Sequence, residues 1–504
     1  MSASVILCLI VGYFVVLMIV SILTSRGANN DSFFIGNKKS PWYLVAFGMI
    51  GASLSGITFV SVTGQPDGRS FGYMQMVFGY IIGYLLIAYV LLPIYYKWNY
   101  TSIYTYLKDR FGEFSYKTGA SFFLISRIAG ASVRLLLVAV IMHDFVFAKF
   151  DFPFWLTVTI SVLFIWLYTF KGGIKTIVWT DTLQTLFMLV AAGATFIFVA
   201  DHFDLGIGEL TAKIFDQEHS QIFFSEWMPA NNWLKQLIAG AVVAFCMTGL
   251  DQDMMQKNLS CKDLRSAQKN MISFTVVLVF ANLFFLMLGS ALLLYANDTE
   301  ISLWMYKGAV QADAMYPTIA LSETQGLGMM VAVLFVLGLV AAAYSSADSA
   351  LTSLTTSVCV DFLKIQDRPA SSQKRVRIFV HIVMSVVLIV VALVLSSILD
   401  KSALYKIFFL ASLTYGPLLG MFAFGIITKR QVKDRLVPVV CLIAPILCWL
   451  LSYFSSDILG TFAMGSELLL VNGMIVFTGL WLISTKSQTL PEAVDNADSI
   501  LGQA

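Results

Sequence analysis

The chain has 504 residues, of which 58% are hydrophobic and only 12% are charged, and its mean hydropathy is +0.80. This composition excludes an ordinary soluble domain and indicates a protein whose solvent is a lipid bilayer. The formal net charge of +2 is too small to indicate a nucleic-acid partner.

Apolar stretches recur from one end of the chain to the other, and each approaches the roughly 20 residues that a helix needs to cross a bilayer. The sequence therefore predicts an all-α integral membrane protein with about 13 transmembrane helices. We expect these helices at residues 3–25, 41–65, 73–96, 118–147, 154–170, 176–201, 234–255, 270–296, 327–361, 376–399, 404–428, 436–454 and 464–484.

Basic residues gather in every second loop between the predicted helices, including one loop with Lys257, Lys262, Arg265 and Lys269. By the positive-inside rule these loops face the cytoplasm. The pattern predicts a multi-pass protein of the cell (inner) membrane, with its N-terminus outside and its C-terminus in the cytoplasm. The polar residues 486–504 are expected to form a cytoplasmic tail.

Two predicted helices contain residues that interrupt an apolar helix. The second has glycine and serine at its centre, from Gly48 to Gly56, and the seventh carries Asp251-Gln252-Asp253. At membrane depth an irregular backbone persists only where protein or a water-filled cavity satisfies its polar groups. Close helix packing is the alternative and would suffice for Gly48 and Gly56 alone, but the polar residues beside them favour a binding site.

The two interrupted helices are five helices apart and enter the membrane from opposite sides, as in an inverted repeat. We therefore expect a first five-helix repeat at residues 41–202 and a second at 234–430. One extra transmembrane helix within 1–30 precedes them, and two extra helices at 436–485 follow them.

Arg127 and Arg134 lie inside the predicted fourth helix, where each costs about 2.5 to 3.5 kcal/mol to insert. Their spacing places them on one face of that helix. Two interpretations stay open. The arginines bind an anionic group of a substrate, or they form structural ion pairs with acidic residues of neighbouring helices.

Two aspartates, Asp181 and Asp348, are predicted at a similar depth in the sixth and ninth helices. Two nearby carboxylates cannot both stay charged unless a cation lies between them, and otherwise one holds a proton. Ser345, Ser346 and Ser349 supply hydroxyl groups close to Asp348, and oxygen ligands suit a hard ion such as sodium. Hydrogen bonds between helices are the alternative role of these hydroxyls.

Four segments together carry a resemblance to a known family. They are Gly51 to Phe59, Gly172-Gly173-Ile174 followed by Trp179-Thr180-Asp181 and Gln184, Ala342 to Ser349, and Gly416 to Gly420 running to Lys429-Arg430. In this order and spacing they resemble the sodium/solute symporter family, whose members carry sugars, amino acids, vitamins, sialic acid and some anions. The resemblance covers nearly the whole chain and implies a five-plus-five inverted repeat with alternating access.

The resemblance also implies sodium sites. The main site would take backbone carbonyl groups of the broken helix and a carbonyl and two hydroxyls of the partner helix, at Gly51, Leu54, Ala342, Ser345 and Ser346. A second site, present in only some members, would use Asp181, Ser345, Asp348 and Ser349. Asp348 stands where relatives often carry Ser or Thr, which leaves open whether a second cation is sodium or a proton.

As the resemblance implies, substrate contacts come from the broken helix, from the two helices after it and from the seventh helix. The matching candidates are Ser55, Thr58, Gln75, Arg127, Arg134, Asp251 and Gln252. In sialic acid carriers an arginine of the fourth helix binds the substrate carboxylate, and that position falls near Ala129 or Gly130, between the two arginines of this chain.

These features predict a sodium-coupled symporter that imports a sugar, a sugar acid such as sialic acid, or an amino acid, with sodium, the solute and the bilayer as its partners. The nearest alternative is a proton-coupled transporter of the same fold. A membrane sensor is disfavoured because the chain ends soon after its last helix. A multi-span transferase is disfavoured because His143, His202, His219 and His381 are scattered, so no enzyme is expected. The oligomeric state is not predicted.

Overall fold

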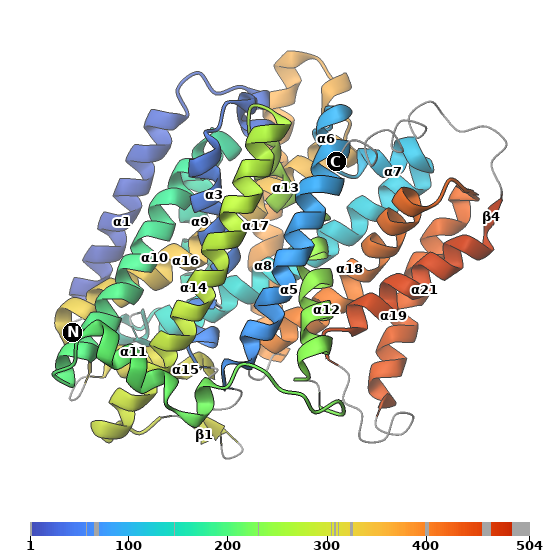
Figure 1. The fold of residues 1–504 in the computed structure, drawn as a ribbon. Helices are drawn as coiled ribbons and strands as arrows, with labels where there is room; N and C mark the ends of the chain where they lie inside the picture. The colour runs from blue at the N-terminus through green and yellow to red at the C-terminus, as the bar shows by residue number, and fades with distance from the viewer. Residues whose placement is uncertain are drawn as a thin grey trace.

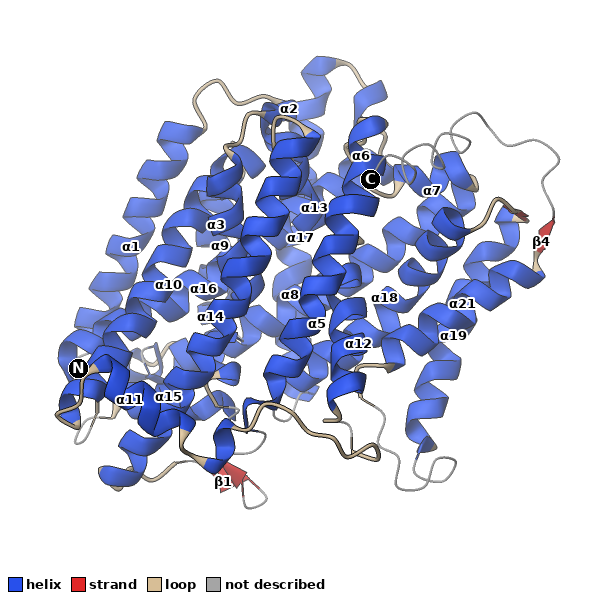
Figure 2. Cartoon of the chain, viewed as in Figure 1, coloured by secondary structure: helices blue, strands red, loops and turns tan. Residues whose placement is uncertain are grey.

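The computed structural model describes residues 3–56, 58–64, 70–145, 147–229, 231–303, 305–306, 309–310, 312–322, 326–398, 403–455 and 465–485. The expected tail at 486–504 lies outside these residues. Within them the chain is almost entirely helical (Figure 2).

The principal helices run across one bundle (Figure 1). They are α1 (Ala3–Thr24), α3 (Trp42–Leu54), α5 (Tyr73–Leu86) with η4 (Ile87–Leu91) and α6 (Leu92–Lys97), α8 (Glu113–Phe145), α9 (Phe154–Thr169), α10 (Ile174–His202), α12 (Trp233–Ala244) with η7 (Phe245–Gly249) and α13 (Gln252–Leu259), α14 (Leu264–Asp298), α16 (Gly328–Ser357) with η8 (Val358–Phe362), α17 (Ala370–Ile398), α18 (Ala403–Ile427), α19 (Val437–Tyr453) and α21 (Leu468–Leu482).

Shorter elements connect these helices at the two ends of the bundle. They are α2 (Asn30–Ile35), η1 (Gly36–Lys38), η2 (Thr58–Val62), η3 (Ser70–Gly72), α7 (Thr105–Arg110), η5 (Phe147–Phe150), α11 (Ile207–Phe215), η6 (Glu218–Ser220), α15 (Ala312–Leu321), η9 (Ile365–Asp367) and η10 (Asp434–Leu436). Two small antiparallel pairs complete the described structure: β1 (Met305–Tyr306) with β2 (Ala309–Val310), and β3 (Gln431–Val432) with β4 (Ser484–Thr485).

Each predicted transmembrane helix has a counterpart among these helices. In the described part of the chain, nine helices are long and apolar enough to cross a bilayer. A tenth is added if α12 and α13, which are bent by 66° at their break, count as one span. The apolar helices α3, α9 and α21 are shorter. The all-α membrane fold is therefore confirmed, while the number of 13 crossings stays a prediction.

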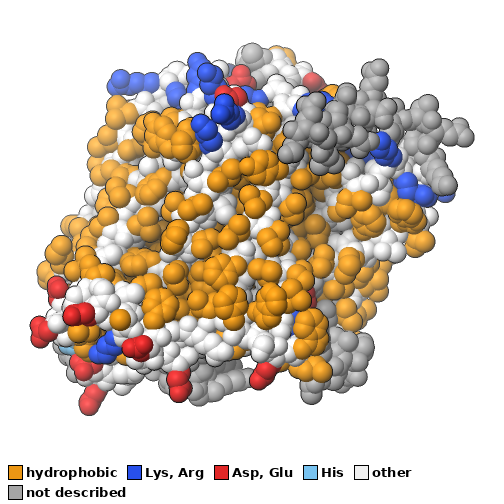
Figure 3. Space-filling view, in the orientation of Figure 1, with side chains coloured by type: hydrophobic (Ala, Val, Ile, Leu, Met, Phe, Trp, Pro, Cys, Tyr) orange, Lys and Arg blue, Asp and Glu red, His pale blue; other side chains and the backbone are white. Residues whose placement is uncertain are grey.

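The surface is that of a membrane protein. On the face that Figure 3 shows, a broad apolar band lies between one rim where Lys and Arg side chains predominate and another where Asp and Glu side chains predominate. Side chains such as Phe280 and Leu442, with 67% and 61% of their surface exposed, face outward in positions where water would penalise them and lipid would not.

The helix contacts come in matched pairs. α3 packs against α14 as α12 packs against α5, and α10 packs against α16 as α18 packs against α8. These pairs are equivalent if the helices from α3 to α10 and those from α12 to α18 are two copies of one five-helix unit, as the inverted repeat requires. Figure 1 shows α19 and α21 side by side at one edge, where both pack against α18.

Glycine allows the closest of these contacts. A Cβ atom at Gly240 of α12 would collide with the backbone carbonyl of Met76 on α5, and one at Gly79 of α5 would collide with the carbonyl of Leu237. The two backbones therefore touch where they cross, which is a packing that small residues permit in membranes.

Candidate functional site

The interruption predicted in the second helix is present. α3 ends at Leu54, and Ser55 has a φ of 21° and a ψ of 171°, outside helical geometry. The chain is helical again at Gly56, and η2 begins at Thr58. Carbonyl groups at such a break have lost their partners within the helix and require others, because lipid supplies none.

The partner of the break is α16. The hydroxyl of Ser346 donates a hydrogen bond to the carbonyl oxygen of Ala52 over 3.4 Å, and α3 and α16 pack together. Gly51 lies against Thr185 of α10, where a Cβ atom would collide with the threonine hydroxyl. The residues proposed for the main sodium site, Gly51, Leu54, Ala342, Ser345 and Ser346, thus lie buried on two adjoining helices.

Asp181 of α10 lies at the centre of a buried polar cluster. Its carboxylate accepts hydrogen bonds from Ser345 over 2.7 Å and from Ser349 over 3.4 Å. The Nζ atom of Lys257 lies 2.7 Å from Asp181 Oδ2, and both side chains are only 1% exposed. The structure therefore brings three of the four candidates for a second cation site into direct contact.

The structure corrects the predicted position of Lys257. The sequence places this lysine among the basic residues of a cytoplasmic loop, but in the structure it is a buried residue of α13. The residues around Lys257 are polar, which is typical of a loop. The bend between α12 and α13 directs this segment into the bundle, so the assignment to a loop was wrong.

Asp348, the fourth candidate, is fully buried on α16 and has a different partner. The hydroxyl of Tyr168 on α9 donates to Asp348 Oδ2 over 2.7 Å. Among the residues that the structure describes, Asp348 Oδ1 has no hydrogen-bond partner.

The two arginines of α8 have different environments. Arg127 contacts Asp253 and lies 3.8 Å from Asp251 Oδ2, and Asp251 also accepts a hydrogen bond from Tyr415. For Arg127 this is a structural ion pair, one of the two alternatives left open by the sequence. Arg134 forms no ion pair or hydrogen bond with the described part of the chain, and its Nε atom is buried without a partner.

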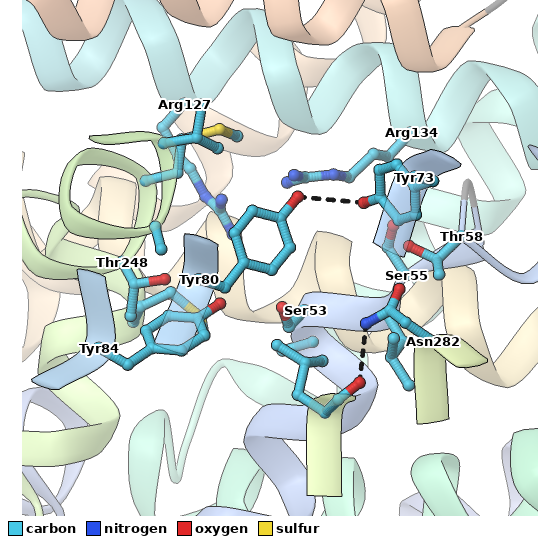
Figure 4. A pocket seen from close by; sticks show the side chains of 17 residues that line it. Ser53, Ser55, Thr58, Tyr73, Tyr80, Tyr84, Arg127, Arg134, Thr248 and Asn282 are labelled. Atoms are coloured by element: carbon cyan, nitrogen blue, oxygen red, sulfur yellow. Dashed lines mark hydrogen bonds between the residues drawn. The ribbon is translucent and has the colours of Figure 1, made fainter. Parts of the chain in front are cut away.

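A cavity of about 100 Å³ lies between the break of α3 and the two arginines. Ser55, Thr58, Arg127 and Arg134 of the predicted substrate residues line it (Figure 4). Figure 4 shows the guanidinium group of Arg134 extending toward the same space as the hydroxyl groups of Tyr73 and Tyr80, which lie 3.1 Å apart.

Six polar residues that line this cavity were not among the substrate residues predicted from the sequence: Ser53, Tyr73, Tyr80, Tyr84, Thr248 and Asn282. The three tyrosines follow one another at helical spacing on a single face of α5, a pattern that could have identified them. Nothing comparable marks Asn282, which lies in the middle of a long apolar helix, α14.

Three other substrate candidates do not line the cavity. Asp251 is held by Tyr415 and Arg127, as described above. The amide of Gln75 donates to the carbonyl of Asn231 over 3.0 Å and accepts from the backbone of Phe224. The amide of Gln252 accepts from the backbone of Ile103 over 2.9 Å and donates to the carbonyl of Thr101. Each glutamine thus links a helix to a connecting segment by hydrogen bonds: Gln75 links α5 to the segment before α12, and Gln252 links α13 to the segment before α7.

Comparison with known proteins agrees with this arrangement. Residues 33–434 match the model of the sodium:solute symporter family. The sodium/sialic acid symporter NanT of Aliivibrio fischeri is 25% identical over 452 residues, 86% of each chain, and the sodium/sialic acid symporter SiaT of Proteus mirabilis is 24% identical over 462 residues, 89% of each chain.

The fold has a solved counterpart. A sodium-coupled sialic acid symporter in a substrate-bound, outward-open state superposes with a TM-score of 0.79 at 20% identity, covering 96% of this chain and 99% of that one. With the family model matching most of the chain and the broken helix facing the hydroxyl groups of α16, the chain belongs to the sodium:solute symporter family and is a sodium-coupled solute symporter, not an enzyme.

Proposed function

We propose that this symporter imports a small organic solute that carries a carboxylate group. Sodium binds where the break of α3 meets α16, and the solute binds in the adjacent cavity with its carboxylate on Arg134. The relatives named above carry sialic acid, a sugar acid, which belongs to this chemical class.

One observation carries the choice of substrate class. Arg134 lines the cavity without an ion pair or hydrogen bond from the described residues. A guanidinium group in the membrane interior is expensive unless it is paired, and its planar array of donors fits a carboxylate in a bidentate manner. The neighbouring carboxylates, Asp251 and Asp253, are already held by Arg127, so an anionic solute is the partner that would complete the pair.

The rest of the cavity suits a hydroxylated solute. Tyrosine, serine, threonine and asparagine side chains form part of its wall, beside apolar side chains such as those of Val243 and Leu278, and the polar groups donate and accept hydrogen bonds. A sugar acid would use both features, because its carboxylate needs the arginine and its hydroxyl groups need the polar wall.

For sodium, we propose the carbonyl groups of Gly51, Leu54 and Ala342 with the hydroxyl groups of Ser345 and Ser346. The environment of Ser345 supports this set. Its hydroxyl donates its proton to Asp181, so its oxygen lone pairs remain free for a cation. Oxygen-only coordination is what a hard ion requires.

Coupling follows from a shared element. The segment from Ala52 to Ser55 lines the solute cavity. It contains Leu54, one proposed sodium ligand, and it directly follows Gly51, another. Either ligand orders this segment for the other, so each binds more tightly when the other is present. After both have bound, the two repeats, at 41–202 and 234–430, rock to open the site to the opposite side.

The direction of transport depends on orientation in the membrane. We propose that the rim rich in Lys and Arg in Figure 3 faces the cytoplasm, by the positive-inside rule. The N-terminus is then outside and the C-terminus is in the cytoplasm. Cysteine labelling of residues in the two long acidic connections, 203–232 and 299–327, would test this, since both are expected to react from outside.

The proposed function is tested by uptake into proteoliposomes at fixed pH, with an inward gradient of sodium or of choline. The solutes are a sialic acid, a short monocarboxylate, a neutral hexose and a zwitterionic amino acid. We expect sodium-dependent uptake of a carboxylate, its loss in Ser346→Ala, and no uptake of the hexose. Equal uptake with choline would refute sodium coupling, and transport of the neutral hexose that is unchanged in Arg134→Ala would refute the substrate class.

A further inference from the structure

The ion pair between Lys257 and Asp181 lies in the interior of the bundle. Lys257 Nζ and Asp181 Oδ2 are 2.7 Å apart, and water is excluded from both side chains. An ammonium group moves into such a place only if a negative charge compensates it. Asp181 supplies that charge, so Lys257 is fixed at this carboxylate.

The ammonium group of Lys257 occupies a position whose surrounding oxygen atoms would also suit a free cation. Around Asp181 lie the hydroxyl groups of Ser345 and Ser349, and a carboxylate with two hydroxyls is an oxygen set that suits sodium. We infer that Lys257 is a tethered cation that fills this second site, so that neither a second sodium ion nor a proton binds there and the transporter carries one sodium ion per cycle.

Electrostatic repulsion opposes a second sodium ion at this place. The ammonium group of Lys257 already lies 2.7 Å from the Asp181 carboxylate. A sodium ion bound to the same oxygen set would face that ammonium group at close range, and like charges repel strongly in a medium of low dielectric constant.

Lys257 also connects the cluster to the interrupted helix. It belongs to α13, the second half of the bent pair, while Asp181 belongs to α10 and the serines to α16. The ion pair joins α13 to α10, and the hydrogen bonds of the two serines to Asp181 add α16, so three helices meet beside the proposed sodium site. A free sodium ion would join only α10 and α16, so the tethered cation also fixes α13 to them.

The inference rests on the proposed function, because it assumes that one sodium ion binds at the main site. Equilibrium binding of radioactive sodium to the purified full-length protein, without solute, measures the number of sites directly. We expect one sodium ion for the wild type, two for Lys257→Gln, and one for the double variant Asp181→Asn/Lys257→Gln, in which the second oxygen set has lost its charge. Lys262→Gln is the matched control, since Lys262 is exposed on the same stretch of chain, and it should bind one.

The outcomes separate the two proposals. No sodium bound by a folded wild type would overturn the proposed function. Two ions bound by the wild type would overturn the tethered cation without any variant being needed. One ion bound by Lys257→Gln, with a melting temperature that rises with sodium as in the wild type, would overturn it as well. If Lys257→Gln does not fold, the number of sodium ions bound by the wild type still tests the inference, because two bound ions would contradict it.

Discussion

At the scale of single residues, α8 shows how burial and partners separate two chemically identical side chains. Arg127 is enclosed by Asp251 and Asp253, while Arg134 faces a polar cavity without a partner from the described chain. The first guanidinium group is paired with carboxylates, and the second has no ion pair with a described residue. Substitution of Arg134 should therefore affect solute binding, and substitution of Arg127 should affect the stability of the fold.

Arg134→Ala should impair binding of the solute and leave the protein stable. The loss of a charge-assisted hydrogen bond costs about 1.5 to 3 kcal/mol, which corresponds to roughly a 10-fold to 150-fold rise in KM. Uptake kinetics in proteoliposomes measure this rise. Arg134→Lys should restore the charge but not the bidentate geometry, and thus only part of the affinity. If the KM were unchanged in both variants, Arg134 would not bind the solute.

Arg127→Ala should impair folding. It leaves two buried carboxylates without their cation, and removing one partner of a buried pair costs about 3 to 5 kcal/mol. We expect a clear fall in melting temperature in detergent, with Arg134→Ala as the control on the same helix face. If the two variants melted alike, the structural role assigned to Arg127 would be wrong.

At the scale of elements, the crossing of α5 and α12 depends on the absence of a side chain. Gly240→Ala would place a methyl group on the carbonyl of Met76, and relief of such overpacking costs about 1 to 3 kcal/mol. Gly193→Ala is the matched control, because a Cβ atom at Gly193 meets no atom within 4 Å. Melting temperatures should fall for the first variant and stay level or rise for the second, since alanine favours helices. Equal values would contradict the contact between the two backbones.

At the scale of the whole molecule, the proposed coupling of one sodium ion to one solute predicts how many charges move in one cycle. One sodium ion carried with one monovalent carboxylate moves no net charge, so uptake should not respond to the membrane potential. Each uncompensated charge would instead be driven by about 2.3 kcal/mol per 100 mV. Uptake at several potassium diffusion potentials measures this, and Lys257→Gln should become sensitive to the potential because it carries a second sodium ion. A wild type driven by the potential would contradict one-to-one coupling with a monovalent anion.

The sequence by itself determined the membrane fold and the two interrupted helices. Apolar stretches long enough for a bilayer identify helices whatever their packing, because every backbone group in lipid must be paired within its own segment. The sequence also predicts a cation site. The evidence for it is local in the chain: the glycine and serine residues from Gly51 to Ser55, and the hydroxyl groups near Ser346.

Only the tertiary structure decided how the charges are paired. Arg127 and Arg134 are alike in the sequence and differ through their neighbours on other helices, and Lys257 resembles a loop lysine until the bend of α12 and α13 carries it to Asp181. Gln75 and Gln252 are polar residues of apolar segments, and the structure shows that their amides bind backbone groups of distant connecting segments. The physical reason is that the energy of a buried charge depends on partners that are distant in the chain, and hydropathy contains no information about them.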